Sequence, residues 1–370
     1  MKIKGYKKIF LTFLGTVMLL AAPIRAEEAY DFGQDDIYQA LPPEAAEVLD
    51  ELDAAPDKVG TDITAENIFA FIWEAIKENA PKPLTMLASV AAVVILCSIT
   101  DSLHDGGSML SGTFNTVGVL ACSGMICTSF ASVMESSKAA INSLSAFLTV
   151  YIPTFAGIMA ASGQTATASA YNATITVASQ FITQFFSVII FPLSSCIMGI
   201  SIAGAINPDF KINTIAEAAK KLIFWSLGLL MAVFTGLLAV QSFVSAAADS
   251  VSMRTIKFTV ASTVPIVGGA VSEALQTVKS SMALLKSTTG SFGIIASVTV
   301  MLPVVLSVIL FRIALMISSA VSDSFGTSRL TVLLRSGECV LAIVIAVLVC
   351  FWLLAVLSTA MMLAISGGAP

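Results

Sequence analysis

The sequence predicts an all-α fold, a polytopic helical membrane protein, from three observations. Hydrophobic residues make up 56% of the 370 residues and charged residues 12%, whereas an ordinary globular chain has about 25% charged residues. Of the 24 acidic residues, 15 lie within positions 27–78, and the other 9 are spread over the rest of the chain. Apolar runs beyond residue 81 approach the ~20 residues that a helix needs to cross a bilayer. We therefore expect a short water-facing segment followed by a membrane domain at residues 81–370.

Residues 1–26 have the order of a secretory signal peptide. Four lysines precede an apolar stretch, and the small residue Ala26 stands directly before the acidic Glu27. A basic start, an apolar middle and a small residue at the cut are typical of such signals. We expect cleavage after Ala26, and an uncleaved first helix is the alternative. Both interpretations place residues 27–80 outside the cytoplasmic membrane.

Residues 27–80 form a strongly acidic extracytoplasmic segment. Residues 30–39 have too little apolar content to pack well, whereas 42–53 and 64–79 have helical patterning. In the second helix, apolar side chains recur on one face, namely Ile68, Phe69, Ile72, Ala75 and Ile76. This face fits either a helix lying against the membrane body or the lipid interface, or a docking surface for an extracytoplasmic partner.

About six transmembrane helices, within a range of five to seven, are expected in the membrane domain. Five candidate crossings are residues 84–100, 177–206, 222–247, 294–320 and 340–365. The sixth comes from 111–134 or from 147–161, and we expect the other of these two segments to enter and leave on the same side. Residues 136–148 between them suit an interfacial helix.

The basic residues near the ends of the predicted helices limit the topology. Lys and Arg in short loops favour the cytoplasmic side of a membrane. One basic group contains Lys211, Lys220 and Lys221, and another contains Arg329 and Arg335. Placing both groups inside puts residues 248–293 and the C-terminus outside.

Residues 256–293 stand apart, and we expect an amphipathic, re-entrant element there. Pro265 and the glycine pair that begins at Gly268 interrupt the apolar pattern. In the stretch that follows, apolar side chains share one helical face, and the rest of the surface carries polar residues that include Ser272, Glu273, Gln276 and Lys279. Irregular backbone at membrane depth is tolerated where protein or a water-lined cavity satisfies its polar groups. The polar face is therefore a candidate lining of a passage.

This region resembles the stage III sporulation protein AE family of endospore-forming bacteria. The likeness rests on a Lys-Phe lead-in, Pro-Ile-Val-Gly, a Ser before Ala-Leu and Thr-Val, then Leu-Leu-Lys and two spaced glycines. The order of signal peptide, acidic segment and polytopic body is similar as well. The positions carried over, none with a catalytic role, are Lys257, Pro265, Gly268, Ser272, Lys279, Leu285, Lys286, Gly290 and Gly293.

The resemblance implies a multi-pass protein of the cell membrane, in the mother-cell membrane around the forespore. Its role would be that of the permease-like subunit of a channel or secretion-like complex needed for endospore development after engulfment. The implied partners are the lipid bilayer and other stage III sporulation membrane proteins, including a separate ATPase, with a homo-oligomer also possible. Two alternatives stay open: a secondary transporter for a small solute, and a non-conducting scaffold for extracytoplasmic partners.

Several charged residues have two possible roles. Arg312 lies inside a candidate crossing, where it either extends to the lipid headgroups or has an internal role in a pore or an ion pair. We expect Asp249 and Glu273 to be solvated. Glu338 is three residues after Arg335, a spacing that allows the two side chains to pair on one helical face.

Small residues and prolines recur in the apolar segments. The spacings of Ser195, Gly199 and Ala203 and of Gly228 and Gly236 allow close helix packing in lipid. We also expect four prolines to break or bend apolar stretches, at Pro153, Pro192, Pro265 and Pro303.

The residues that enzymes use are scarce, so we expect neither catalysis nor a cofactor. His104 is the single histidine, which excludes a zinc site with two imidazoles, and no Gly-x-x-x-x-Gly-Lys-Ser/Thr motif for ATP is present. The six cysteines all lie in apolar segments, which indicates small buried side chains and not a disulfide framework. No basic patch with interleaved aromatic residues suggests nucleic-acid binding.

Overall fold

The computed structural model describes residues 34–51, 65–103, 109–206, 212–263 and 268–366. All elements assigned in these residues are helices. Six of the described helical segments are long and apolar enough to cross a membrane, which confirms the predicted class and the central number. The predicted signal peptide, residues 1–26, lies outside the described residues.

Three short helices precede the membrane body: α2 (Gln34–Gln39), α3 (Pro43–Glu51) and α4 (Ala65–Asn79). The last two confirm the helical patterning read from the sequence. The prediction that residues 30–39 pack poorly is wrong for α2, because Ile37 is fully buried in the main core. The ring of Tyr38 also lies 6.4 Å from that of Phe292 on α10. Two well-placed apolar side chains are enough to anchor so short a helix.

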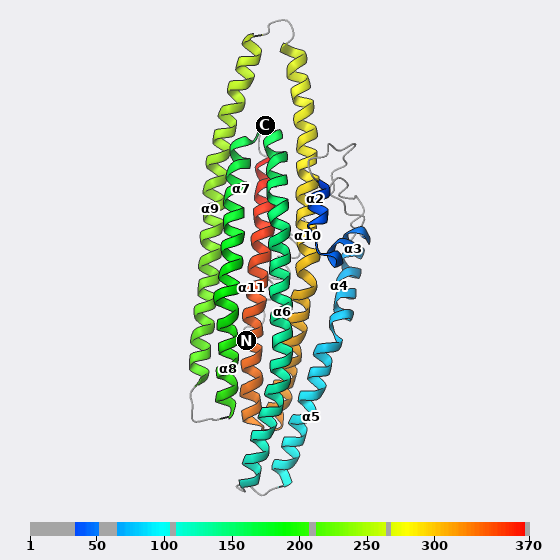
Figure 1. The fold of residues 1–370 in the computed structure, drawn as a ribbon, viewed down its shortest axis with the longest axis vertical. Coiled ribbons are helices and arrows are strands. Elements are labelled where there is room, and N and C mark those ends of the chain that lie inside the picture. Colours follow the sequence, from blue (N-terminus) through cyan, green and yellow to red (C-terminus); the bar gives the residue numbers. More distant parts are fainter. Residues whose placement is uncertain (1–33, 52–64, 104–108, 207–211, 264–267, 367–370) are drawn as a thin grey trace.

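The long helices run up and down the molecule in turn (Figure 1). They are α5 (Pro81–Leu103), α6 (Met109–Ala161), α7 (Thr165–Phe185) with the π-helical turn η1 (Phe186–Ile190) and α8 (Phe191–Ile206), α9 (Ile212–Thr263), α10 (Gly268–Ser324) and α11 (Ser328–Ser366). We call the end where α9 stops and α10 starts the upper end, as in Figure 1. The start of α9 and the turn between α10 and α11 lie at the lower end, so Lys220, Lys221, Arg329 and Arg335 share one end, as their charges predicted.

Helix α6 overturns the expectation of a re-entrant segment before α7. A single helix of 53 residues replaces the three separate elements expected within 111–161, and Pro153 lies inside it. A proline removes one backbone hydrogen bond, which a long helix supported by its neighbours tolerates. A continuous helix cannot enter and leave a membrane on the same side. The predicted number of three crossings before the basic start of α9 still holds, because three apolar segments precede it: α5, α6 and the α7–α8 segment.

The region 256–293 is not a separate dipping element. Its first part continues α9 to Thr263, and its second part begins α10 at Gly268. Helix α9 ends at Thr263 and α10 begins at Gly268, whereas the predicted break at Pro265 itself lies outside the described residues. Pro303 lies within α10 without ending it. The helices contain 52 and 57 residues, about 80 Å each, so both reach far beyond a hydrocarbon layer of about 30 Å. Their ends form two arms above the rest of the bundle (Figure 1).

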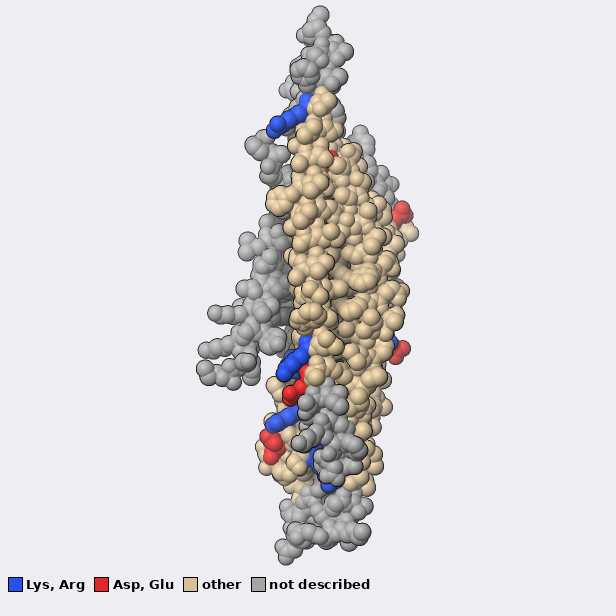
Figure 2. All heavy atoms as spheres, turned by 90° about the vertical axis from the view of Figure 1, so that its left-hand side faces the viewer, with Lys and Arg blue, Asp and Glu red and all other residues tan. Residues whose placement is uncertain are grey.

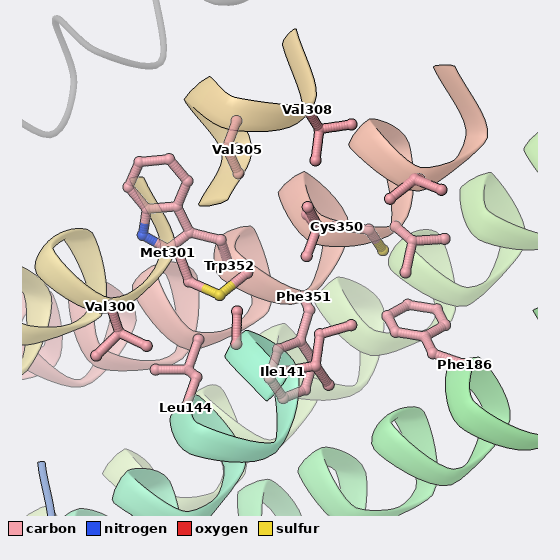
Figure 3. Packing of buried hydrophobic residues seen from close by; sticks show 14 of the residues in the cluster. Ile141, Leu144, Phe186, Val300, Met301, Val305, Val308, Cys350, Phe351 and Trp352 are labelled. Carbon is pink, nitrogen blue, oxygen red and sulfur yellow. The ribbon is translucent and has the colours of Figure 1, made fainter. Parts of the chain in front are cut away.

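Helix α11 forms the centre of the bundle. Of its most apolar window 72% is buried, against 22% for α9. Trp352 and Phe351 of α11 are enclosed by Met301 of α10, Ile141 of α6 and Phe186 of η1 (Figure 3). The Trp352 indole donates a hydrogen bond of 3.3 Å to the Ser297 hydroxyl, which satisfies its polar group in this apolar interior.

The outer surfaces of α8, which carries Gly199, and of α9, which carries Gly228 and Gly236, have small residues that do not pack as predicted. A Cβ added at Gly199, Gly228 or Gly236 would meet no atom within 4 Å. These glycines therefore make no close helix contacts within the chain. Figure 2 looks onto the side of α9 and shows a broad surface without charged side chains between the charged groups near the two ends. Large exposed side chains such as Trp225, Val233 and Phe243 lie on α9.

Candidate functional site

Lys286 has the most unusual surroundings of the motif residues, because its charged side chain is buried. It lies on α10 with 1% of its surface exposed, and Nζ donates a hydrogen bond of 3.0 Å to Oε1 of Gln164. Gln164 is the residue directly before α7. The turn that holds it contains Gly163 at φ 88°, a left-handed conformation that favours glycine. This turn therefore presents the glutamine amide to the buried ammonium group.

Asp249 of α9 lies at the other side of the same turn. Its carboxylate accepts hydrogen bonds from the backbone N–H groups of Ala166 and Thr167, at 2.8 and 3.0 Å, and from the Thr167 hydroxyl at 2.5 Å. The first N–H groups of a helix have no partner inside it and favour negative charge. Gln164, the residue before α7, makes no capping hydrogen bond with its side chain. A carboxylate from a different helix therefore caps α7.

The expectation that Asp249 is solvated is wrong, since 6% of its surface is exposed. Its charge and that of Lys286 are close enough to interact electrostatically. Removing an isolated charge from water costs several kcal/mol unless an opposite charge and hydrogen bonds compensate. We call Gln164, Thr167, Asp249 and Lys286 the Asp249–Lys286 site. It joins α7, α9, α10 and the turn after α6 at the base of the two arms.

A layer of hydroxyl groups lies next to this site, inside the bundle. The Tyr151 hydroxyl donates to the Thr289 carbonyl at 3.4 Å, and the hydroxyls of Tyr151 and Tyr171 both lie beside Thr359. The Thr289 hydroxyl and the Gln241 side-chain amide are buried without a hydrogen-bond partner in the described protein. Such groups are costly to bury. The upper part of the bundle is thus polar inside, in contrast to the core around Trp352.

The two motif glycines are packing residues. A Cβ on Gly293 would overlap the ring and hydroxyl of Tyr151, and a Cβ on Gly290 would lie 2.6 Å from Leu363 Cδ2. Both glycines therefore let α10 approach α6 and α11 closely. The sequence singled out these positions through the family resemblance, and the structure gives them a physical reason.

The structure brings together four of the predicted site residues. Leu285, Lys286, Gly290 and Gly293 all lie on the buried face of α10. Pro265 is outside the described residues, and Gly268 is the first residue of α10. The side chains of the remaining arm residues lie outside the described part of the chain: Lys257, Ser272, Glu273, Gln276 and Lys279.

Arg312 is exposed on the outside of α10, which favours contact with headgroups over an internal role. Arg312 lies near Cys339 of α11, and Lys220 of α9 does too, so cations of two helices lie at one level near the lower end.

The predicted pairing of Arg335 with Glu338 is wrong. Arg335 instead forms an ion pair of 2.9 Å with Asp323 across the α10–α11 turn, and Glu338 accepts a hydrogen bond of 2.6 Å from Ser319. Contacts between helices replaced the pairing within one helix.

Sequence reasoning missed Asp249 and Gln164 as parts of the site. Asp249 follows the long uncharged stretch that begins after Lys221, and a lone carboxylate on such a helix is a signal for a buried partner. Gln164 gave no comparable signal, because its role depends on where the α6–α7 turn places it.

Comparisons with known proteins agree on one family. The sequence profile described as Stage III sporulation protein AE matches residues 50–366. The chain is 22% identical over 229 residues to the stage III sporulation protein AE of Bacillus subtilis (strain 168), and this similarity covers 61% of the chain and 56% of that protein. The match thus spans little more than half the length of the curated relative. No solved structure matches. Because the family profile covers most of its length, the chain belongs to the stage III sporulation protein AE family.

Proposed function

We propose that this protein is the multi-pass membrane subunit of the mother cell–forespore assembly required for endospore development after engulfment, and that any passage forms between subunits. It would lie in the mother-cell membrane around the forespore, with its arms on the far side from the basic lower end. Other stage III membrane proteins and a separate ATPase would complete the complex. The protein itself would bind no cofactor and catalyse no reaction.

The observation that carries this proposal is the filled interior of the bundle. Phe186, Phe351 and Trp352 are buried at its centre, and the cavity between Met86, Phe311 and its neighbours near the lower end measures about 10 Å³. A cavity of this size holds about one water molecule at most. In the described part of the core, large side chains therefore fill the space that a solute would need. If the family's assembly conducts, the conducting surface belongs to an interface, for which the two arms are the best candidates.

Accessibility of single cysteines on the upper arm of α10 tests this proposal. With the native cysteines replaced, we expect Glu273→Cys, Gln276→Cys and Lys279→Cys to react with a membrane-impermeant maleimide in sporulating cells. The labelling should change when the partner proteins are deleted. Val233→Cys, an exposed apolar position on α9, is the matched control and should stay unreactive in both strains. Labelling of the three arm positions that does not depend on partners would contradict the proposal.

One observation favours the alternative of a secondary transporter. Asp249 and Lys286 are opposite charges buried between helices, as in the coupling sites of transporters. Uptake of a solute or of protons by the purified protein in liposomes, abolished by Asp249→Asn, would support that function. Absence of such activity together with loss of sporulation would support the assembly role.

A further inference from the structure

The buried side-chain groups that lack a hydrogen-bond partner gather in one part of the bundle. Such groups are rare in folded proteins, and water is a common explanation for them. Among the described residues, the side-chain atoms concerned belong to Tyr171, Gln241, Ser242 and Thr289. Where these four residues lie therefore indicates where a further polar ligand would bind.

All four residues lie below the Asp249–Lys286 site by one or two helical turns. Thr289 follows Lys286 by three residues on α10, and Tyr171 follows Thr167 by four on α7. Both helices run from the upper end to the lower end (Figure 1), so each of these hydroxyl groups is on a residue one turn lower on the same face. The other two residues, on α9, precede the site's carboxylate by seven and eight positions, about 10–12 Å lower. The unpartnered groups thus extend the site into the bundle.

The two charges of the site attract each other without direct contact. Asp249 acts electrostatically on Lys286, yet the ion pair found in the described residues joins Arg335 and Asp323. An ammonium group has several N–H donors, and in the described chain that of Lys286 has one acceptor, Oε1 of Gln164. Water commonly bridges polar groups that are separated in this way.

The hydroxyl layer below the site supplies both donors and acceptors. The Ser358 and Thr359 hydroxyls donate to the Ala355 carbonyl, at 2.8 and 3.0 Å, so their oxygens can still accept. The Tyr171 hydroxyl lies beside both oxygens and has a proton without an acceptor, as does the Thr289 hydroxyl. A water molecule that accepts from one hydroxyl and donates to another satisfies groups that the protein alone leaves unpaired.

We infer that a cluster of internal water molecules fills this part of the bundle. It bridges Asp249 and Lys286 and extends to the hydroxyls of Tyr171 and Thr289. The two opposite charges favour a neutral ligand, because Lys286 repels a cation and Asp249 repels an anion. A buried water molecule makes about three hydrogen bonds, so more than one is needed to reach both levels. The inference concerns the interior of a single chain and does not depend on the proposed assembly role.

The aromatic core around Trp352 is the matched dry region. Trp352 and Phe351 are as deeply buried as Tyr151 and Tyr171, and apolar side chains enclose them (Figure 3). The polar group of Trp352 already has its acceptor, the Ser297 hydroxyl. We therefore expect water beside the two tyrosines and none beside Trp352 and Phe351.

Hydroxyl-radical labelling by X-ray radiolysis tests the inference, because radicals that form from internal water modify the side chains next to it. In the purified full-length protein in nanodiscs, mass spectrometry should show Tyr151 and Tyr171 labelled about fivefold faster or more than Trp352 and Phe351. Trp352 is the stringent control, since an indole is as reactive towards the radical as a phenol. Labelling of the tyrosines that is as slow as that of Trp352 would overturn the inference.

Thr289→Val gives a second measurement, because it removes one hydroxyl and keeps the side-chain shape. If Thr289 binds water, the variant should lower the unfolding temperature and reduce Tyr171 labelling about threefold. The matched control is Thr299→Val, which removes a buried hydroxyl that donates to the Ile295 carbonyl and should leave Tyr171 labelling unchanged. A raised unfolding temperature in Thr289→Val would show that the hydroxyl is unpaired and would contradict the inference. Equal loss of Tyr171 labelling in both variants would contradict it as well.

Discussion

Helices α9 and α11 are both long and apolar, yet they occupy opposite environments. The most apolar window of α11 is 72% buried and that of α9 is 22% buried. Lipid and protein interior are similarly apolar, so hydropathy does not distinguish a central helix from a peripheral one. Packing geometry makes the difference: Trp352 of α11 is enclosed, whereas Trp225 of α9 has 66% of its surface exposed. Shape complementarity and a few polar contacts therefore decide whether a membrane helix is central or peripheral in the bundle.

The two tryptophans give the largest expected contrast between α11 and α9. Trp352→Ala should lower the free energy of unfolding by about 3–5 kcal/mol, since it leaves a cavity at the centre of the bundle. Trp225→Ala should change it by less than about 1 kcal/mol. Reversible unfolding in mixed micelles would measure both. Equal losses for the two variants would show that the α9 face is also packed against protein.

Asp249 is the exception on the exposed helix α9, and its replacement measures how strongly the upper end is held. Asp249→Asn keeps the shape but removes the charge that caps α7 and faces Lys286. We expect a loss of about 1.5–3 kcal/mol, read out by faster hydrogen exchange at the start of α7. Asp323→Asn breaks an exposed ion pair and should cost less than about 1 kcal/mol. If Asp249→Asn lowered the free energy of unfolding no more than Asp323→Asn does, the Asp249–Lys286 site would not stabilise the fold.

Glycines sharpen the same comparison with smaller changes. Gly293→Ala forces a methyl group against the Tyr151 ring, and we expect a loss of about 1–3 kcal/mol from overpacking. Gly236→Ala on α9 adds its methyl group in open space and should be neutral or stabilising by up to about 1 kcal/mol. Thermal unfolding of the two variants in detergent would check both signs. A stabilising Gly293→Ala would contradict the close approach of α10 and α6.

The smallest expected effect lies in the short helices outside both α9 and α11. The Tyr38 hydroxyl has one proton to donate, and the Ala46 carbonyl, at 3.0 Å, and the Asp50 carboxylate are its two acceptors. Partial burial, together with this carboxylate, raises the pKa of Tyr38 to about 12 from its ordinary value of 10.0. The folded state prefers the neutral tyrosine, so its contribution is complete below pH 10 and is lost as the pH rises to about 12.

Hydrogen exchange of α2 across this pH range would test the Tyr38 contact. Protection should fall between pH 10 and 12 in the wild type, beyond the intrinsic rise of the exchange rate, and Tyr38→Phe should remove this step. The same substitution should destabilise α2 by about 0.5–1.5 kcal/mol at neutral pH. A step that persists in Tyr38→Phe would assign the titration to another group.

The helical class was predictable, whereas the continuity of α6 (Met109–Ala161) and the side-chain environments were not. The helices α3 and α4 and the start of α10 at Gly268 followed from periodicity and turn residues. The burial of Asp249 did not, because the carboxylate is satisfied by the start of α7, 82 residues away in sequence. The cysteines illustrate the same limit: Cys97, Cys122 and Cys350 are buried as expected, whereas Cys127 and Cys196 are exposed.

Composition and apolar run length alone predicted an all-α chain with about six helices able to cross a membrane, because a lipid environment requires every backbone hydrogen bond to be made within the helix. The tertiary structure decided that α11 is central, that α6 is unbroken and that Asp249 and Lys286 meet at one turn. A uniformly apolar helix does not encode which of its faces turns inward. That choice depends on how side chains from distant segments fit together, at positions such as Gly293 and Tyr151.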